Sequence, residues 1–325
     1  MIIHPELRAL RVDDTPQRVA QEALIAIVGG WKKAPHFAAI VGQLADFAKG
    51  DDISGLPLLA ALFDAQSTAA RDLSQDVSRL LASALARHRL GHVPFRHFAD
   101  DTISTLQLAK SGNATLSLVA IDGEGLARKP GAVTADFSPS EVWEQVLCGT
   151  GQAELIDRGT TGADHAELDC SALKMAPGVV IVRDARLRNM QLRSVEGCLV
   201  SLRLQRRLAD AGPTMEYDLA TGKLVHLAAG NPQDSRIELM MALLGRMERS
   251  DAAPVLAEIA QSQSSTALRW QGLRECLALD TAAGFAALSV VSQSAEDDLA
   301  PAAGALRSQL IESYPQLQEL DKCHA

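Results

Sequence analysis

The 325-residue sequence has no long apolar run. Its longest apolar stretches, Ala23–Trp31 and Leu56–Phe63, fall far short of the ~20 residues that a membrane-spanning helix needs. The first residues, Met-Ile-Ile-His-Pro-Glu, have neither the basic start nor the apolar core of a signal peptide. We therefore expect a cytoplasmic protein that has no membrane-spanning segment and no membrane partner.

Paired cysteines are absent as well. The five cysteines are odd in number and widely spaced, with no Cys-x-x-Cys pair: Cys148, Cys170, Cys198, Cys276 and Cys323. A zinc knuckle or a framework of disulfides needs cysteines in paired spacing. The sequence therefore predicts reduced thiols.

A surplus of positive charge is the third absence. The chain has 31 Lys and Arg residues against 40 Asp and Glu residues, a formal net charge of −9. Proteins that bind the phosphate backbone of nucleic acids need clustered basic side chains, so we expect no nucleic-acid partner. The remaining composition, 47% hydrophobic and 22% charged residues, is that of an ordinary globular protein.

Residues 1–90 have the pattern of a helical N-terminal region. A capping segment, Asp13–Pro16, precedes a first helix that Gly29-Gly30 is expected to end. Val19, Ala23 and Ile27 fall on one face of it. Apolar residues at helical spacing predict two more helices, roughly over 35–49 and 67–88. The simplest interpretation is a packing or dimerisation module without chemistry.

Residues 91–229 change to short β-like runs, separated by turns that are rich in glycine and polar residues. No amphipathic helix of 10–15 residues interrupts them, which argues against parallel β-α-β units. Closely spaced short strands favour an antiparallel sandwich or barrel. Gly149-Thr150-Gly151 is interpreted as a hairpin turn between strands at 142–147 and 153–156, and residues 217–225 as a further hairpin.

Residues 230–325 return to a helical pattern, with helices expected near 251–262, 266–277, 281–292 and 299–311. Arg269 in one helix and Asp280 at the following turn resemble the arginine and aspartate of HEAT-type repeats. The resemblance implies a C-terminal helical repeat, whereas a small helical appendage packed on the β region is the other interpretation.

Two segments within residues 137–204 form a further pattern. Glu141–Gly151 has the cadence Glu-x-x-Tyr-Val-Leu-x-Gly, and Pro177-Gly178 leads through an apolar strand and a loop into the closing strand 198–204. In this order the segments resemble the two motifs of the cupin superfamily. The resemblance implies an α+β chain: a central antiparallel cupin-like jelly-roll β-barrel over 91–229, flanked by the α-helical regions 1–90 and 230–325.

Functional cupins bind a metal through two histidines, a glutamate and a further histidine. The resemblance places the first pair at Ser138 and Ser140, the glutamate at Val142 or Glu144, and the last histidine at Asn189. Hydroxyls, an amide and one carboxylate make a poor site for Fe(II), Mn(II) or Zn(II). We therefore expect no metal and no cofactor, and we assign no catalytic residue.

Strand alternation gives the candidate ligand pocket. Glu144 is expected to point into the barrel beside Asn189 and Gln191, with residues 143 and 145 on the other side. Arg188 is the fourth pocket candidate, and it belongs to a run of seven arginines between residues 183 and 207. Such a run suits an anionic ligand or an acidic partner. Alternatively, these arginines are solvated or pair with the acidic C-terminal helices.

These observations lead us to expect a non-enzymatic cupin-like protein that binds a small molecule, or a protein partner through its C-terminal helices. The alternatives are a cupin-type metalloenzyme, a dioxygenase or isomerase with non-standard ligands, and a cupin-bearing transcriptional regulator. We also expect a homodimer, because the five consecutive apolar residues Met240–Leu244 cannot all face one side of a helix. Some of them must be covered by the barrel or by a second subunit.

Overall fold

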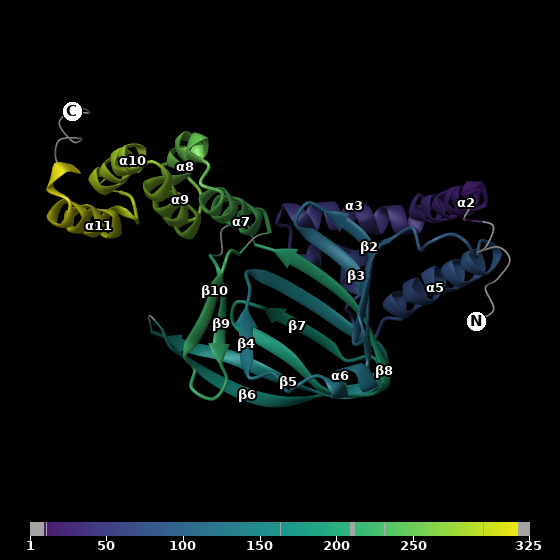
Figure 1. The fold of residues 1–325 in the computed structure, drawn as a ribbon. Coiled ribbons are helices and arrows are strands. Elements are labelled where there is room, and N and C mark those ends of the chain that lie inside the picture. Colours follow the sequence, from purple (N-terminus) through teal and green to yellow (C-terminus); the bar gives the residue numbers. More distant parts are fainter. Residues whose placement is uncertain are drawn as a thin grey trace. The chain divides into compact units, whose positions relative to one another are not determined.

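The computed structural model describes residues 10, 12–162, 164–208, 212–230, 232–294 and 296–317, so Cys323 lies outside the described residues. The chain divides into two compact units, Met1–Asp210 with Met215–His226, and Ala211–Thr214 with Leu227–Ala325. The first unit combines helices with antiparallel sheets, whereas the second is mostly helical (Figure 1). Within the described residues, no helix is long and apolar enough to cross a membrane.

The helices of the first unit precede its sheets, apart from one short helix. They are α2 (Thr15–Lys32), α3 (Pro35–Lys49), the 3-10 helix η1 (Ile53–Gly55), α4 (Pro57–Ala61), α5 (Ala69–Arg87) and the short α6 (Gly123–Arg128). The sequence predicts α3 and α5 closely but misses α4. Gly50 ends α3 with a φ of 118°, a left-handed conformation that glycine adopts without a steric penalty.

The first helix differs from the expectation in its end and in its buried face. The helix continues through Gly29-Gly30 to Lys32, because Trp31 stacks on Phe37 with 4.1 Å between the ring centroids, and this packing outweighs the low helix propensity of glycine. Its buried residues are Ala20, Leu24 and Val28, whereas Val19 is exposed. The buried stripe therefore lies one residue further along than the predicted one.

Among the described residues, ten strands form two antiparallel sheets. A seven-stranded sheet has the order β1-β2-β3-β8-β5-β6, with β7 also paired to β5, and a three-stranded sheet has the order β10-β9-β4. Their bounds are β1 (Arg96–Ala99), β2 (Ile103–Ser111), β3 (Ala114–Asp122), β4 (Thr134–Phe137), β5 (Ser140–Thr161), β6 (Ala166–Met175), β7 (Val180–Asp184), β8 (Arg188–Arg207), β9 (Thr214–Asp218) and β10 (Leu224–Ala228).

The two longest strands, β5 and β8, pair along nearly their whole length, from Ser140 opposite Arg207 to Asp157 opposite Arg188. The predicted hairpin turn at Gly149-Thr150-Gly151 is therefore wrong, since these residues lie inside β5. The ladder shifts its register around them, and Gly149 has a φ of 85°. The glycine makes an irregularity within a strand rather than a reversal of the chain.

Both ends of β5 are bonded to the same short turn between β7 and β8. The Ala185 N–H donates to the Ser140 carbonyl, and the Arg158 N–H donates to the Leu187 carbonyl, each at 2.7 Å. Residues 140 and 158 of one strand can reach this turn together only because β5 is strongly bent, as the curved sheet in Figure 1 shows. The chain thus combines helices with an antiparallel sheet, and the closed jelly-roll barrel stays a prediction.

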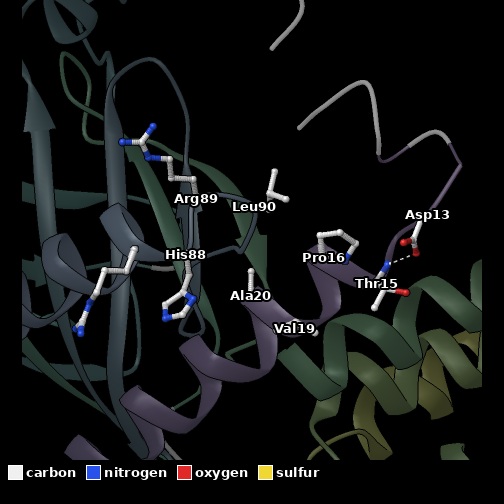
Figure 2. A pocket seen from close by; sticks show the side chains of 9 residues that line it. Asp13, Thr15, Pro16, Val19, Ala20, His88, Arg89 and Leu90 are labelled. Carbon is white, nitrogen blue, oxygen red and sulfur yellow. Dashed lines mark hydrogen bonds between the residues drawn. The ribbon is translucent and has the colours of Figure 1, made fainter. Parts of the chain in front are cut away.

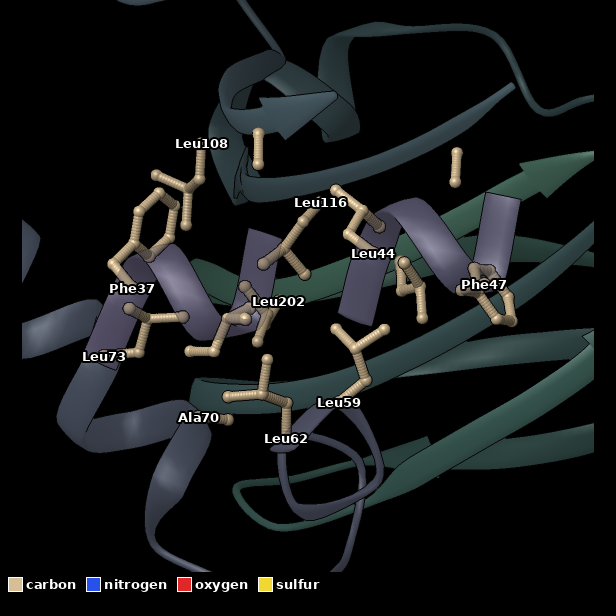
Figure 3. Close-up of a cluster of buried hydrophobic side chains, with 14 of the residues drawn as sticks. Phe37, Leu44, Phe47, Leu59, Leu62, Ala70, Leu73, Leu108, Leu116 and Leu202 are labelled. Carbon is tan, nitrogen blue, oxygen red and sulfur yellow. The ribbon is translucent and has the colours of Figure 1, made fainter. Parts of the chain in front are cut away.

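The N-terminal helices cover one face of the seven-stranded sheet. Their buried side chains meet leucines of β2, β3 and β8 in one apolar cluster, which includes Leu44, Phe47, Leu116 and Leu202 (Figure 3). Trp143 of β5 packs edge-on against Phe47 of α3, with 5.2 Å between the ring centroids. The helices α2 to α5 therefore share their core with the sheet.

A single arginine joins this helical layer to β8. The Arg206 guanidinium lies 4.1 Å from the centre of the Phe47 ring and donates hydrogen bonds from Nη1 to the backbone carbonyls of Phe47 and Asp51. It also pairs with Glu141 on β5 at 2.6 Å. Arg206 therefore adds hydrogen bonds to carbonyls at the C-terminal end of α3, where the regular helical bonds run out.

The second unit contains α7 (Pro232–Arg246), η2 (Ser250–Ala252), α8 (Ala253–Ala260), α9 (Thr266–Leu279), α10 (Thr281–Gln293), α11 (Ala300–Ser313) and η3 (Pro315–Leu317). Asp280 caps α10 by accepting hydrogen bonds from the N–H groups of Ala282 and Ala283. Arg269 of α9 donates to Asp297, before α11, and to the Ala260 carbonyl at the end of α8. The HEAT-type resemblance stays a prediction.

The apolar residues of α7 are split between the two sides of that helix. Met241 is 1% exposed and packs with Leu256 and Leu268 of the same unit. Met240 and Leu243 are both 54% exposed. The unit's own helices thus cover only part of the stretch that the sequence predicts to need covering, and the expected homodimer stays a prediction.

The core between helices and sheet gives a stability prediction. Leu202 is fully buried there, so Leu202→Ala removes apolar contacts and leaves a cavity. We expect it to lower the free energy of unfolding by about 3 kcal/mol in chemical denaturation. Leu187→Ala is the matched control, because Leu187 is 53% exposed and should cost less than about 0.5 kcal/mol. Equal costs for the two variants would contradict the described core.

The Arg269–Asp297 pair gives a prediction on pH. Both side chains are 12% exposed, and the hydrogen bond from Arg269 holds the pKa of the Asp297 carboxyl below its ordinary value of 3.8. A carboxyl whose pKa is lowered by folding stabilises the fold above the unfolded-state pKa, and this contribution is lost as the pH falls through the folded-state pKa.

We therefore expect Arg269→Gln to lower the thermal midpoint of the helical circular dichroism signal at neutral pH, with the difference from the unaltered chain shrinking below about pH 4. Arg249→Gln is the control, because Arg249 pairs with Asp251 on the surface, with side chains 52% and 67% exposed. A difference between Arg269→Gln and the unaltered chain that does not depend on pH would contradict this role of Asp297.

Candidate functional site

The candidate site centres on Glu144, a carboxylate that β5 buries to 2% exposure. The register of the ladder places Arg203 of β8 directly opposite it. Ser201 Oγ donates to Glu144 Oε1 at 2.6 Å, and Arg203 Nε donates to Oε2 at 3.1 Å. A buried charge persists when it is paired and hydrogen-bonded, and Glu144 meets both conditions.

Arg183 of β7 brings a second guanidinium to the same face. It lies directly opposite Val142 in the β5–β7 register, and Val142 alternates onto the face of Glu144. Its Nε is buried, and no described residue accepts a hydrogen bond from it. Burial lowers the pKa of the Arg183 guanidinium, and the charge of Arg203 lowers this pKa further, against the opposing effect of Glu144. Arg183 therefore lies on the same face as Arg203, with its Nε buried and without an acceptor among the described residues.

The surroundings of this charged group are apolar on one side and open on the other. Val146, Ile181 and Leu199 are buried in one cluster, and Val146 lies on the same face as Glu144. The side chain of Arg203 is 30% exposed, although that of its partner Glu144 is only 3% exposed. Solvent therefore reaches Arg203 but not the carboxylate.

Asn189 and Gln191 of β8 make their described side-chain hydrogen bonds with β4 rather than with Glu144. Their shared lining with Glu144 stays a prediction.

The two amides connect β8 to β4. Asn189 Nδ2 donates to the Asp136 carbonyl and Gln191 Nε2 donates to the Thr134 carbonyl, each at 2.7 Å. The side-chain carbonyl oxygens of both amides are buried without a hydrogen-bond partner among the described residues. Both residues join the two sheets, and their role in ligand binding stays a prediction.

Arg188, the fourth candidate, is engaged elsewhere. It pairs with Asp157, its direct partner on β5, through Nε at 2.5 Å and Nη2 at 2.9 Å. The side chains of the pair are 42% and 37% exposed. Since neighbouring residues of a strand point to opposite faces, Arg188 points away from the side of Asn189. Its assignment to a ligand pocket also stays a prediction.

The arginine run between residues 183 and 207 is explained by local ion pairs. Five of its members pair with carboxylates of β5 and β7: Arg186 with Asp184, Arg188 with Asp157, Arg193 with Glu154, Arg203 with Glu144 and Arg206 with Glu141. The alternative in which the run pairs with the acidic C-terminal helices is therefore wrong for these five. The register sets most of these pairs, because three of the carboxylates lie directly opposite their arginines.

The positions that correspond to cupin metal ligands carry hydroxyls. Ser138 Oγ lies 3.2 Å from Ser140 Oγ, and Ser140 is 2% exposed. Among the described residues, no three His, Cys, Asp or Glu side chains are placed to hold a metal ion together. A neutral hydroxyl is a weak ligand for a first-row transition metal, so this donor set does not fit one.

A surface pocket of about 530 Å³ lies elsewhere, between the start of α2 and residues 87–90 after α5 (Figure 2). Its lining includes Asp13 and Val19 on one side and His88 and Arg89 on the other. Asp13 accepts a hydrogen bond from the Thr15 N–H, which lowers the pKa of its carboxyl. The carboxylate at this pocket already accepts a hydrogen bond from the backbone, and it is fully on the surface.

Two residues of the Glu144 group escape prediction from sequence. Ser201 has no motif of its own, and only the β5–β8 register shows that it meets Glu144. Arg183 is one of seven clustered arginines, and only the structure shows that five of the others pair with carboxylates while Arg183 has none opposite it. The sequence signal for both residues is the alternation of side chains along a strand. It predicts the face of each side chain only when the positions of the register shifts are known.

Comparison with known proteins gives partial similarities. No protein-family model matches this sequence, and no curated protein matches it. A cupin superfamily protein from Desulfitobacterium hafniense DCB-2 is 13% identical over 34% of this chain and 83% of its own, with a TM-score of 0.24. A sugar phosphate isomerase from a cupin superfamily, from Silicibacter pomeroyi DSS-3, is 13% identical over 39% of this chain and 77% of its own, with a TM-score of 0.23.

A 7S globulin of Momordica charantia is 13% identical over 39% of this chain, with a TM-score of 0.26. The matched part spans only 36% of the globulin. The structural neighbours therefore include cupin superfamily proteins. At these TM-scores and identities, the similarities carry no argument about the activity of this chain.

The Glu144 group gives the next prediction. Glu144→Ala removes the acceptor of both Ser201 and Arg203, and we expect it to lower the free energy of unfolding by about 3 kcal/mol. Glu154→Ala, which breaks a pair whose side chains are 30% and 35% exposed, is the control and should cost less than about 1 kcal/mol. Denaturant titration measures both variants. A loss for Glu144→Ala as small as that of the control would mean that the buried pair contributes little.

Proposed function

We propose that this chain is a cupin-like, non-enzymatic protein that binds a small anionic molecule, and that the anionic group contacts Arg183 and Arg203. The observation that carries the proposal is the charge balance among Arg183, Arg203 and Glu144. Two guanidinium groups share one face with a single buried carboxylate, Glu144, so one positive charge is left over. The exposed Asp136 is close enough to affect the pKa of Arg183 but is the least of the causes acting on it.

The chemistry of arginine supports an oxyanion as the ligand. A guanidinium presents a planar fork of N–H donors that matches a carboxylate or a phosphate. Arg203 already uses Nε and Nη2 on Glu144, whereas Arg183 Nε has no acceptor among the described residues. A carboxylate or phosphate group would supply the missing acceptor and the missing negative charge together.

The alternative of a cupin-type metalloenzyme has less support. It would need ligands other than Ser138, Ser140 and Asn189, and the amide nitrogen of Asn189 is already committed to Asp136. Neither the regulator alternative nor a protein partner at the C-terminal helices has a particular contact in its favour. The proposal therefore rests on the arginines.

Calorimetric titration of the full chain with inorganic phosphate and with succinate tests the proposal. We expect at least one of these anions to bind, and to raise the thermal midpoint, since a ligand at ten times its Kd stabilises a protein by about 1.4 kcal/mol. Arg183→Gln should weaken that binding at least tenfold. This variant should stay folded, because it removes a charge that burial and Arg203 both disfavour.

Arg188→Gln is the matched control. It removes an arginine of the same run that is paired with Asp157 on the surface, and it should leave anion binding unchanged. Equally weak binding in Arg183→Gln and Arg188→Gln would mean that net charge, rather than Arg183 itself, governs the binding of the anion. Absence of binding for both anions, or full binding in Arg183→Gln, would overturn the proposal.

A further inference from the structure

Two cysteines face each other where the β5–β8 ladder is interrupted. Cys148 of β5 has Val200 as its direct partner, and the next pair along the ladder joins Thr150 to Glu196. Between these two pairs the chain advances two residues along β5 but four residues along β8. Cys198 lies within the extra segment of β8, two residues from Val200.

Cys148 and Cys198 lie on the same face of the sheet. Residues two apart on a strand point the same way, so Cys198 points with Val200, and Val200 points with its partner Cys148. Gly149 brings the backbones together, since a Cβ at this position would lie 2.2 Å from the Cys198 carbonyl oxygen. The two thiols also interact: burial raises the pKa of Cys198, and the neighbouring Cys148 raises it further.

Their accessibility separates these thiols from the buried Cys276. Both Cys148 and Cys198 are exposed, whereas Cys276 is fully buried and its thiol lies against the Ala253 carbonyl. Cys170 is exposed as well, but its pKa is affected by Glu154 and Arg193 rather than by another thiol. Cys148 and Cys198 are thus an exposed pair of thiols that interact with each other.

We propose that Cys148 and Cys198 are a redox modification site, at which a peroxide oxidises the two thiols to an intramolecular disulfide. In the first step the Cys148 thiolate attacks one peroxide oxygen: the S–O bond forms, the O–O bond breaks, and the departing hydroxide takes up a proton to become water. In the second step Cys198 attacks the sulfur of the sulfenic acid: the S–S bond forms, the S–O bond breaks, and a second water leaves. Two electrons pass from the thiol pair to one peroxide.

The order of the two steps follows from the environment of the thiols. The thiolate is the nucleophile, and the raised pKa of Cys198 disfavours its thiolate form, so Cys148 attacks first and Cys198 resolves the sulfenic acid. The new bond would connect β5 to β8 at the position where the ladder has lost its regular pairing.

Peptide mapping of the full-length chain after treatment with one equivalent of hydrogen peroxide tests this proposal. Free thiols are alkylated before digestion without reductant. We expect a cross-linked peptide pair that contains Cys148 and Cys198, with the titratable thiols falling from five to three, and full recovery after reduction. Cys198→Ser should instead accumulate a sulfenic acid on Cys148, which a cyclic diketone probe labels.

Cys170→Ser is the control and should form the same cross-link, its thiols falling from four to two. Circular dichroism of each variant before oxidation establishes that it is folded. Sulfinic acid on either cysteine without the cross-link would overturn the proposal. So would a disulfide that includes Cys170 or Cys323, or covalent dimers on a non-reducing gel.

Discussion

The pairing of β5 with β8 is the constraint on which the rest of the first unit depends. Its register places Glu144 opposite Arg203 and Asp157 opposite Arg188, so that the arginines of one strand meet the carboxylates of the other. The same pairing points Leu202 toward the N-terminal helices and Ser201 toward Glu144. A slip of one residue would exchange these two faces, burying charges against the helices and exposing their leucines.

The local elements of this fold could be predicted from the sequence, but its longest strand could not. Helices such as α3 and α5 follow from their apolar spacing, and a glycine at 50 with positive φ ends the first of them. Gly149 has the same conformational freedom, yet it lies inside β5. A glycine with positive φ can therefore end a helix or lie within a strand. Pairing with another strand decides which of the two occurs. The closed barrel, the HEAT-type repeat and the dimer stay predictions.

The candidate site could be predicted only in part, for a related reason. Alternation along a single strand correctly points Glu144 to a buried face. It does not fix the faces of Asn189 and Gln191, because the register shifts near Val146, Cys148 and Gln152 change which residues of β5 and β8 share a side. Likewise, a count of seven arginines does not reveal that Arg183 has no carboxylate opposite it, since Val142 holds that position. The chemistry at such a site is decided by pairs of residues rather than by single ones.

The hydrogen bonds from Arg206 to α3 also have a consequence for folding during synthesis on the ribosome. Arg206 follows Phe47, whose carbonyl it binds, by 159 residues. Leu202 and Leu204, which cover the same helices, are made only shortly before it. The N-terminal helices are therefore synthesised long before the strand that shields their apolar face, and contacts of such long range form slowly. Until β8 emerges, that face is available to chaperones and to other unfinished chains.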